Sequence, residues 1–428
     1  MRTNFSADQM KTPLIRLAND ILRRCVHCGF CNSTCPTYIL KGDELDGPRG
    51  RISMIKGMFE RGGPASEKLT LHIDRCLSCL SCTSTCPSSV DYMHLVDKAR
   101  VHIEETHIRP SFERILRSLV ANLLPNPKMF RLALIGAWVA KPLAQFLPGK
   151  LGVIAKLAPA RIPSPSPVDR PQVYPAQGTQ RKRVALLTGC AQKVLDPEIN
   201  EATIRLLTRH GCEVVVPAGS GCCGALVHHM GREADAEVQA KANIEAWEHV
   251  AKTGGLDAVV INASGCGTVI KDYGFMFREN DAWVERAKNI SGLAKDVTEI
   301  MTDLGVNKSL DNTGLRVTYH SACSLQHGQK IKTQPVELLQ AVGFDVYQPA
   351  EGHLCCGSAG TYNIFQSEIA EQLLDRKVGN LQRTEPDVIA AGNIGCMVQL
   401  RGGMDVPVVH TVSLLDWATG GPKPEGIE

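Results

Sequence analysis

Two short cysteine-rich runs hold the residues of this sequence that are best suited to chemistry. Residues 25–36 read CVHCGFCNSTCP and residues 76–87 read CLSCLSCTSTCP, so each cysteine recurs 51 positions later. Thiolates at these spacings, with a proline after the fourth, are typical ligands of [4Fe-4S] clusters. The cysteines are Cys25, Cys28, Cys31 and Cys35 in the first run, and Cys76, Cys79, Cys82 and Cys86 in the second.

Both runs match CxxCxxCxxxCP, and here the sequence resembles the bacterial dicluster ferredoxins. In that family the first three cysteines of a run bind one cluster and the fourth binds the other. A pair of four-cysteine zinc sites is the competing interpretation, but zinc sites usually use two CxxC pairs and need neither the third cysteine nor the proline. The resemblance implies one site with Cys25, Cys28, Cys31 and Cys86, and another with Cys76, Cys79, Cys82 and Cys35.

Length and composition favour a multidomain globular protein. The 428 residues are 43% hydrophobic, enough for two or three cores, and a net charge of +3 gives no argument for nucleic acid. The 17 cysteines are mostly adjacent or two to three residues apart, which suits metals better than disulfides. The first 20 residues lack a basic start followed by an apolar stretch, so we expect a reducing cytoplasm.

Helical patterns surround the two cysteine runs. LIRLANDILRR precedes the first run and ISMIKGMFERGG lies between the two, both with apolar residues at helical spacing. The sequence therefore resembles the all-helical dicluster ferredoxin domain of succinate dehydrogenase iron-sulfur subunits, rather than the compact β-rich form. We assign residues 1–105 to this domain.

Residues 106–180 are predicted to form a basic amphipathic helical segment and a Pro-rich linker. Between residues 109 and 161 there are nine Lys or Arg residues against a single acidic one, Glu113. The longest apolar stretch is interrupted by Arg131 and Lys141, so it is too short and too charged to span a bilayer. The segment is suited to lying on a membrane surface, or equally to packing on the ferredoxin domain or a partner subunit.

The rest of the chain contains a second duplication. In each copy 31 residues separate a cysteine from a CCG triplet, and a further cysteine follows; the two sets are Cys190, Cys222, Cys223 and Cys266, then Cys323, Cys355, Cys356 and Cys396. Apolar, β-branched runs such as VALLTGC and DAVVINASGC alternate with helical patterns. This alternation predicts two α/β repeats with parallel strands, over residues 181–312 and 313–428.

These eight cysteines are predicted to form a candidate additional centre. They follow strands, and the carboxyl ends of parallel strands meet at one edge of a sheet, where ligands bind. The alternative is that they are small buried hydrophobic residues, which suits a lone cysteine such as Cys212. Histidines near them could tune or ligate a centre, although loop histidines more often only form hydrogen bonds; they are His228, His229, His320 and His353.

Over its whole length the sequence resembles the iron-sulfur subunit of bacterial glycolate oxidase. The stretches HGQKIKTQPVELL, CCGSAGTYN and AGNIGCMVQL carry this resemblance. The small iron-sulfur subunit of anaerobic glycerol-3-phosphate dehydrogenase and the lactate-utilisation proteins are related. The active CCG modules of heterodisulfide reductase close with CxxC and thus have a fifth cysteine. Here the closing stretches read CGTV and CMVQ, which departs from that pattern.

The resemblance implies an electron-transfer subunit with two [4Fe-4S] clusters and no catalytic residues of its own. FAD-containing partner subunits would oxidise glycolate to glyoxylate, and this chain would pass the electrons toward membrane quinone. It would sit peripherally on the cytoplasmic face of the inner membrane. The alternatives are the same relay role for a glycerol-3-phosphate or lactate dehydrogenase and, from a different class, a zinc-binding structural scaffold.

Overall fold

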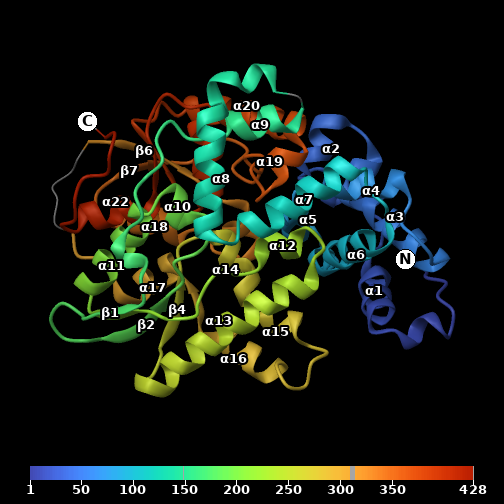
Figure 1. The fold of residues 1–428 in the computed structure, drawn as a ribbon, viewed down its shortest axis with the longest axis horizontal. Helices are drawn as coiled ribbons and strands as arrows, with labels where there is room; N and C mark the ends of the chain where they lie inside the picture. The colour runs from blue at the N-terminus through green and yellow to red at the C-terminus, as the bar shows by residue number, and fades with distance from the viewer. Residues whose placement is uncertain (148, 309–313, 428) are drawn as a thin grey trace.

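The computed structural model describes residues 1–147, 149–308 and 314–427. The amino-terminal helices lie at one end of the molecule, and two α/β units pack beside each other at the other end, coloured green to yellow and orange to red in Figure 1. The expected class, a helical domain followed by two α/β repeats with parallel strands, is confirmed. The boundary that we predicted between the repeats, at residues 312 and 313, lies outside the described residues.

Six helices form the amino-terminal part, and they bury one apolar core of their own. Proline at the first position starts three of them, where its fixed φ suits the helix and its missing N–H costs nothing. Their short connections are the loops that hold the two cysteine runs. The helices are α1 (Pro13–Arg24), α2 (Pro36–Lys41), α3 (Pro48–Arg61), α4 (Glu67–Asp74), α5 (Ser81–Thr85) and α6 (Tyr92–Thr106).

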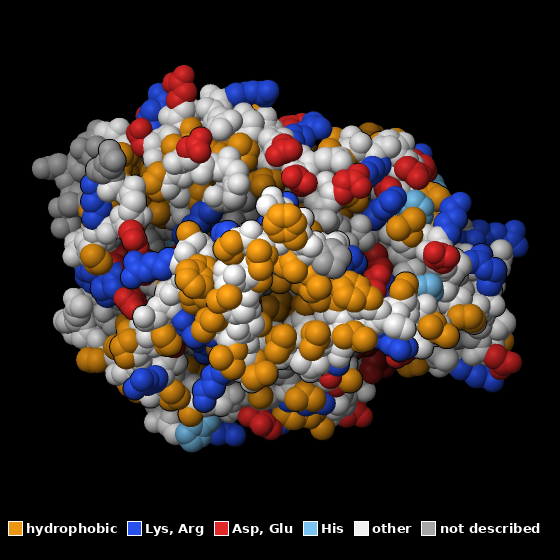
Figure 2. Space-filling model, turned by 45° about the horizontal axis from the view of Figure 1, so that its top comes forward, with side chains coloured by type: hydrophobic (Ala, Val, Ile, Leu, Met, Phe, Trp, Pro, Cys, Tyr) orange, Lys and Arg blue, Asp and Glu red, His pale blue; other side chains and the backbone are white. Residues whose placement is uncertain are grey.

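Three further helices, which we name the capping segment, cross from the amino-terminal part onto the α/β units: α7 (Ser111–Leu123), α8 (Pro127–Ala140) and α9 (Lys150–Lys156). Helix α7 packs Leu116 and Val120 into the core of the first α/β unit. Leu134 is the one side chain of α8 that is buried. Figure 2 shows hydrophobic side chains gathered in a patch over this segment. None of the described helices is both long and apolar enough to cross a membrane.

The first sheet has the strand order β1-β3-β2-β4-β5. All its pairs are parallel except β1 with β3, because β1 comes from the predicted Pro-rich linker and adds to the sheet edge. Pro171 and Pro175 flank β1, and proline is tolerated at edge strands. The strands are β1 (Gln172–Tyr174), β2 (Lys182–Leu186), β3 (Cys212–Val216), β4 (Ala258–Ile261) and β5 (Ala294–Asp296).

The helices of this unit alternate with its strands, as the sequence pattern predicted. They are α10 (Gln192–Leu195), α11 (Glu198–Arg209), α12 (Ala225–His229), α13 (Glu233–Gly254), α14 (Ser264–Lys271), α15 (Tyr273–Met276), α16 (Val284–Leu293) and α17 (Val297–Leu304).

The second sheet is wholly parallel, with the strand order β7-β6-β8-β9. Its strands are β6 (Arg316–His320), β7 (Asp345–Tyr347), β8 (Val388–Ala391) and β9 (Val408–His410). Its helices are α18 (Gln334–Ala341), α19 (Tyr362–Phe365), α20 (Ser367–Gln382), α21 (Ile394–Arg401) and α22 (Thr411–Ala418).

One apolar core joins the two sheets, so the α/β units form a single rigid support for the loops at their strand ends. Helices α11 and α22 meet in this core. At their polar edge Arg205 and Arg209 of α11 bind the buried carboxylate of Asp416 in α22, at 2.7 and 2.9 Å.

A histidine fastens the amino-terminal helices to the first α/β unit. His94 of α6 lies between Asp91, at 2.5 Å, and Asp272, at 3.1 Å, and its ring stacks on Phe275. Burial lowers the pKa of His94, but hydrogen bonds to Asp272 and Asp91 outweigh burial and raise it from 6.5 to about 9. The charged imidazolium therefore links two parts of the chain that lie far apart in sequence.

We predict that this contact weakens in mildly alkaline solution. Because the pKa of His94 is higher in the folded than in the unfolded chain, its contribution to stability is complete below pH 6.5 and is lost as the pH rises to about 9. The thermal unfolding temperature should fall over this interval in the natural protein. In His94→Gln, which has no imidazole to titrate, the fall should be smaller, and equal slopes for the two proteins would contradict the assignment.

Candidate metal centres

The first amino-terminal site is built from loops at the ends of short helices. Cys25 ends α1, Cys31 lies in the 3-10 turn Phe30–Asn32, and Cys86 ends α5. Together with the exposed Cys28 they line one small cavity, which Cys82 also touches. The structure thus brings together the three leading cysteines of one run and the last of the other.

The second site has the reciprocal composition. Cys76, Cys79 and Cys82 surround a second small cavity, and Cys35, which precedes α2, completes it. All four are buried. Four converging thiols in a small enclosed space fit the donor set that a [4Fe-4S] cluster requires.

The two cysteine runs also share backbone conformations at equivalent positions. His27 and Gly29 flank Cys28 with φ of 58° and 86°, and Ser78 and Leu80 flank Cys79 with φ of 51° and 61°. Left-handed conformation is costly for leucine, and such strain persists only where the surrounding structure enforces it. At a third pair of equivalent positions the hydroxyls of Thr34 and Thr85 bond to each other at 3.1 Å, so the two runs lie against each other at this point.

Two buried cations favour thiolate at the second site. Burial opposes ionisation of Cys76, but Arg51 and Arg100 outweigh it and lower the pKa of this thiol. Arg51 is 1% exposed, donates to the Cys35 sulfur at 3.8 Å and to the carbonyl of His72 at 2.8 Å. At the first site, by contrast, burial and the neighbouring Cys25 raise the pKa of Cys31 to about 11, so there the metal itself must displace the proton.

In the first α/β unit the cysteines converge as the topology predicted. Cys190 follows β2, Cys222 and Cys223 follow β3, and Cys266 lies in α14 after β4. Contact with Cys222, together with burial, holds the pKa of Cys190 well above that of an ordinary thiol. Such thiols become ligands only when a metal replaces their protons.

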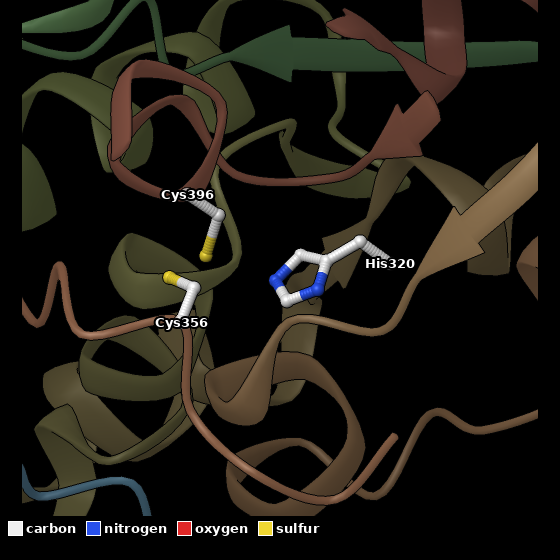
Figure 3. Close-up of side chains that lie close together, drawn as sticks. All are labelled: His320, Cys356 and Cys396. Atoms are coloured by element: carbon white, nitrogen blue, oxygen red, sulfur yellow. The ribbon is translucent and has the colours of Figure 1, made fainter. Parts of the chain in front are cut away.

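The second α/β unit repeats this set with one addition. The Cys323 sulfur lies 3.8 Å from that of Cys355. Cys356 and Cys396 lie close to each other and to the imidazole of His320 at the end of β6, and Figure 3 shows that ring turned toward both sulfurs. His320 was one of four histidines near the cysteines in sequence, and only the fold distinguishes it from the rest.

The structure explains why each CCG triplet ends in glycine. Gly224 and Gly357 have φ of 89° and 92°, and a Cβ on them would lie 3.0 Å from the Ala236 carbonyl and 2.5 Å from the Ala370 carbonyl. Helices α13 and α20 therefore approach the two triplets too closely for a larger residue. Cys212, outside both sets, lies in β3 within the core, as expected for a lone buried cysteine.

One cavity of about 1000 Å³ joins the two sets, and cysteines of both line it. Apolar side chains of the capping segment cover it, among them Leu116, Leu134 and Ile154. The loop of the second amino-terminal site, at Cys76 and Leu77, reaches the same space. No pattern in the sequence predicted this cavity, because its walls come from segments as far apart as Glu67 and Val398.

The second amino-terminal site also touches the second cysteine set directly. Leu77 and Cys79 pack with Cys355 and Tyr362, and the Tyr362 hydroxyl donates to the Arg75 carbonyl at 2.9 Å. The candidate centres therefore form a continuous series rather than isolated sites.

Comparison with known proteins agrees with this arrangement. The 4Fe-4S dicluster domain family matches residues 21–90, and the Cysteine-rich domain family matches residues 184–271 and 317–401. The chain is 38% identical to the glycolate oxidase iron-sulfur subunit of Escherichia coli (strain K12), covering 98% of this chain and 99% of that protein. It is 32% identical to the probable glycolate oxidase iron-sulfur subunit of Bacillus subtilis (strain 168), covering 95% and 96%.

The chain belongs to the glycolate oxidase iron-sulfur subunit family.

As a member of this family it is a component of an oxidoreductase complex and an iron-sulfur protein with two [4Fe-4S] clusters. A more distant similarity, 27% identity over 55% of this chain, links it to lactate utilization protein A of Bacillus subtilis (strain 168). A crystal structure of a hypothetical protein from Helicobacter pylori has the same fold, with a TM-score of 0.51, 11% identity, and coverage of 96% of this chain and 78% of that one.

We predict that the ligands cross between the two runs, as their positions around the cavities suggest. In Cys35→Ser the cluster near Cys76, Cys79 and Cys82 should be lost or altered, whereas the cluster near Cys25 should keep its electron paramagnetic resonance signal. Cys212→Ser, a change at a buried cysteine outside every site, is the matched control and should leave both signals intact. Loss of the other cluster in Cys35→Ser would refute the crossed assignment.

Proposed function

We propose that this chain carries electrons from a flavin-containing partner, which oxidises glycolate to glyoxylate, to a quinone in the membrane. The bound clusters supply one-electron transfer, and the polypeptide holds them in order. The observation that carries the proposal is the contact of Cys79 and Leu77 with the second cysteine set, because it joins the amino-terminal sites to the large cavity.

Electrons enter, in this proposal, at the first amino-terminal site. Cys28 is exposed there, and Val26 and Phe30 on either side of it expose 67% and 62% of their surface. Large exposed apolar side chains around a redox centre suit the docking of a partner protein. All four cysteines of the second site are buried. In this proposal electrons therefore reach that site from the first site and leave it toward the cavity.

The cavity is the proposed acceptor site. We infer that each four-cysteine set holds a further metal centre, so that centres at both sets face the same space. Between the sets and the capping segment the walls are largely apolar, with Leu119, Leu123 and Phe130 among them. A hydrophobic quinone fits such walls, whereas a polar acceptor would lose its hydration there.

Reconstitution tests the proposal directly. Flavoprotein partners without this chain should reduce artificial dyes with glycolate but should not reduce quinone, and adding the chain should restore glycolate-dependent quinone reduction. The Cys35→Ser variant should fail to restore it and Cys212→Ser should succeed, which separates electron transfer from a merely structural role. Unchanged quinone reduction without the chain would disprove the relay.

The same assay decides between substrates. The similarity to lactate utilization protein A makes a lactate-oxidising flavoprotein the second candidate donor, and glycerol-3-phosphate remains the third. If the complex responds to one of these substrates and not to glycolate, the electron-transfer role stands but the electron donor is a different flavoprotein.

We further propose that the capping segment rests on an anionic membrane. Exposed apolar side chains dominate its outer surface, and the exposed cations Lys128 and Lys156 are placed to meet lipid phosphates. Arg131 and Lys141, the two cations that interrupt its apolar stretch, instead donate hydrogen bonds to the carbonyls of Pro163 and Ala158 in the following linker. They hold the segment together, so they are poor positions for testing lipid contact.

Binding to vesicles that contain anionic lipid should therefore respond to both kinds of exposed residue. Replacing Leu132 and Val139, 65% and 64% exposed, by serine should weaken binding by roughly tenfold or more, since each buried methylene contributes about 0.8 kcal/mol. Lys128→Glu with Lys156→Glu should remove the salt dependence, which arises from screening over about 10 Å at 0.1 M. Val238→Ser, equally exposed on α13, is the control; if it acts like the Leu132 and Val139 changes, the surface is not specific.

A further inference from the structure

His320 is a buried imidazole whose burial the rest of the chain does not explain. Its residue is 1% exposed, and neither ring nitrogen has a hydrogen-bond partner within the described parts of the chain. Leaving a buried polar group unsatisfied costs about 1–3 kcal/mol, so such groups in native proteins usually have a partner that protein atoms do not supply.

The other buried histidines each have at least one hydrogen bond, although Nε2 of His410 has none, whereas both ring nitrogens of His320 lack a partner in the described parts of the chain. His72 bonds to the Asp46 carboxylate at 2.8 Å, and His210 donates to the Leu206 carbonyl at 2.8 Å. His410 accepts from the backbone N–H of Val412 at 3.2 Å. An imidazole that only filled space in this core would be expected to have at least one such bond.

The neighbours of His320 are thiols. A ring nitrogen and the sulfurs of Cys356 and Cys396 all lie within 4.8 Å of one another, with the ring directed at the sulfurs (Figure 3). A neutral imidazole has a nitrogen lone pair that can bind a metal. Cys323 and Cys355, whose sulfurs lie 3.8 Å apart, line the same cavity as Cys356 and Cys396.

The first repeat has no imidazole at the position that corresponds to His320. His320 stands three residues before Cys323, and at the same distance before Cys190 the first repeat has Leu187. Leu187 is 2% exposed and packs in the core of its unit. The first repeat therefore fills this position with an ordinary apolar side chain, and only the second repeat has a side chain there that could bind a metal.

We propose that His320 is a nitrogen ligand of an iron-sulfur centre in the second α/β unit, bound together with Cys356, Cys396, Cys323 and Cys355. The first unit, with leucine at the matching position, offers thiolates alone. An imidazole adds a donor without adding negative charge, so the second centre gains coordination without the lower reduction potential that a further thiolate would cause. This inference rests on the proposal that the cysteine sets hold metal, but not on which substrate the partner oxidises.

The test uses the full chain, purified without oxygen and labelled with ¹⁵N-histidine. Pulsed electron paramagnetic resonance should detect coupling of a histidine nitrogen to a cluster. In His320→Leu, which copies the first repeat, the coupling should vanish while the signals of the two amino-terminal clusters remain. His353→Asn, a change at a more exposed histidine of the same unit, should leave the coupling intact.

A second variant covers the case in which His320→Leu does not fold. In His320→Cys the nitrogen coupling should vanish while the iron content is kept, and the reduction potential of this centre should fall because of the added charge. Iron at the second set without nitrogen coupling in the natural protein would overturn the ligand assignment alone. Eight iron atoms per chain, unchanged when Cys355 and Cys356 become alanine, or zinc at this set, would overturn both this inference and the metallation that it rests on.

Discussion

The metal sites of this protein all depend on placing thiolates in an interior that disfavours charge. Burial raises the pKa of Cys31 and Cys190, so these thiols stay protonated unless a cation compensates. At the second amino-terminal site Arg51 and Arg100 supply that compensation for Cys76. Burial still raises the pKa of Cys79 and Cys82 well above the ordinary value, so a metal would have to displace their protons. This requirement explains why the cysteines sit on loops held at helix and strand ends, where backbone geometry is fixed by the supporting core.

Each duplication produces two similar sites, and a few residues that differ between the copies make the surroundings of the two sites unequal. The amino-terminal runs share left-handed positions and the Thr34–Thr85 bond, but only the second site has the buried Arg51, which donates to the Cys35 sulfur. In the α/β units the corresponding difference is His320 against Leu187. Since nearby charge and ligand type influence cluster potentials, such differences would help to give the proposed relay a direction.

The sequence predicted those features that depend on local spacing. The CxxCxxCxxxCP runs, the repeated CCG triplets and the alternation of strands and helices led to the right class and to convergence of the cysteines. It missed features that depend on contacts between distant segments. Strand β1 was mistaken for linker because three residues at a sheet edge leave almost no pattern, and His320 differs from His353 only through what surrounds it in the fold. The cavity arises where the capping segment meets both repeats, which periodicity cannot reveal.

The position of the cavity bears on how one-electron centres serve a two-electron acceptor. Reduction of a quinone to its quinol needs two electrons and two protons, whereas each cluster passes single electrons. Cysteines of both α/β units line the same space, so centres at the two sets would face one bound acceptor from two sides. The exposed surroundings of Cys28 lack such enclosure, and a half-reduced acceptor there would meet water and oxygen. If the cavity is the acceptor site, as we propose, the apolar cover of α7, α8 and α9 above the paired sets would retain a half-reduced acceptor until its second electron arrives.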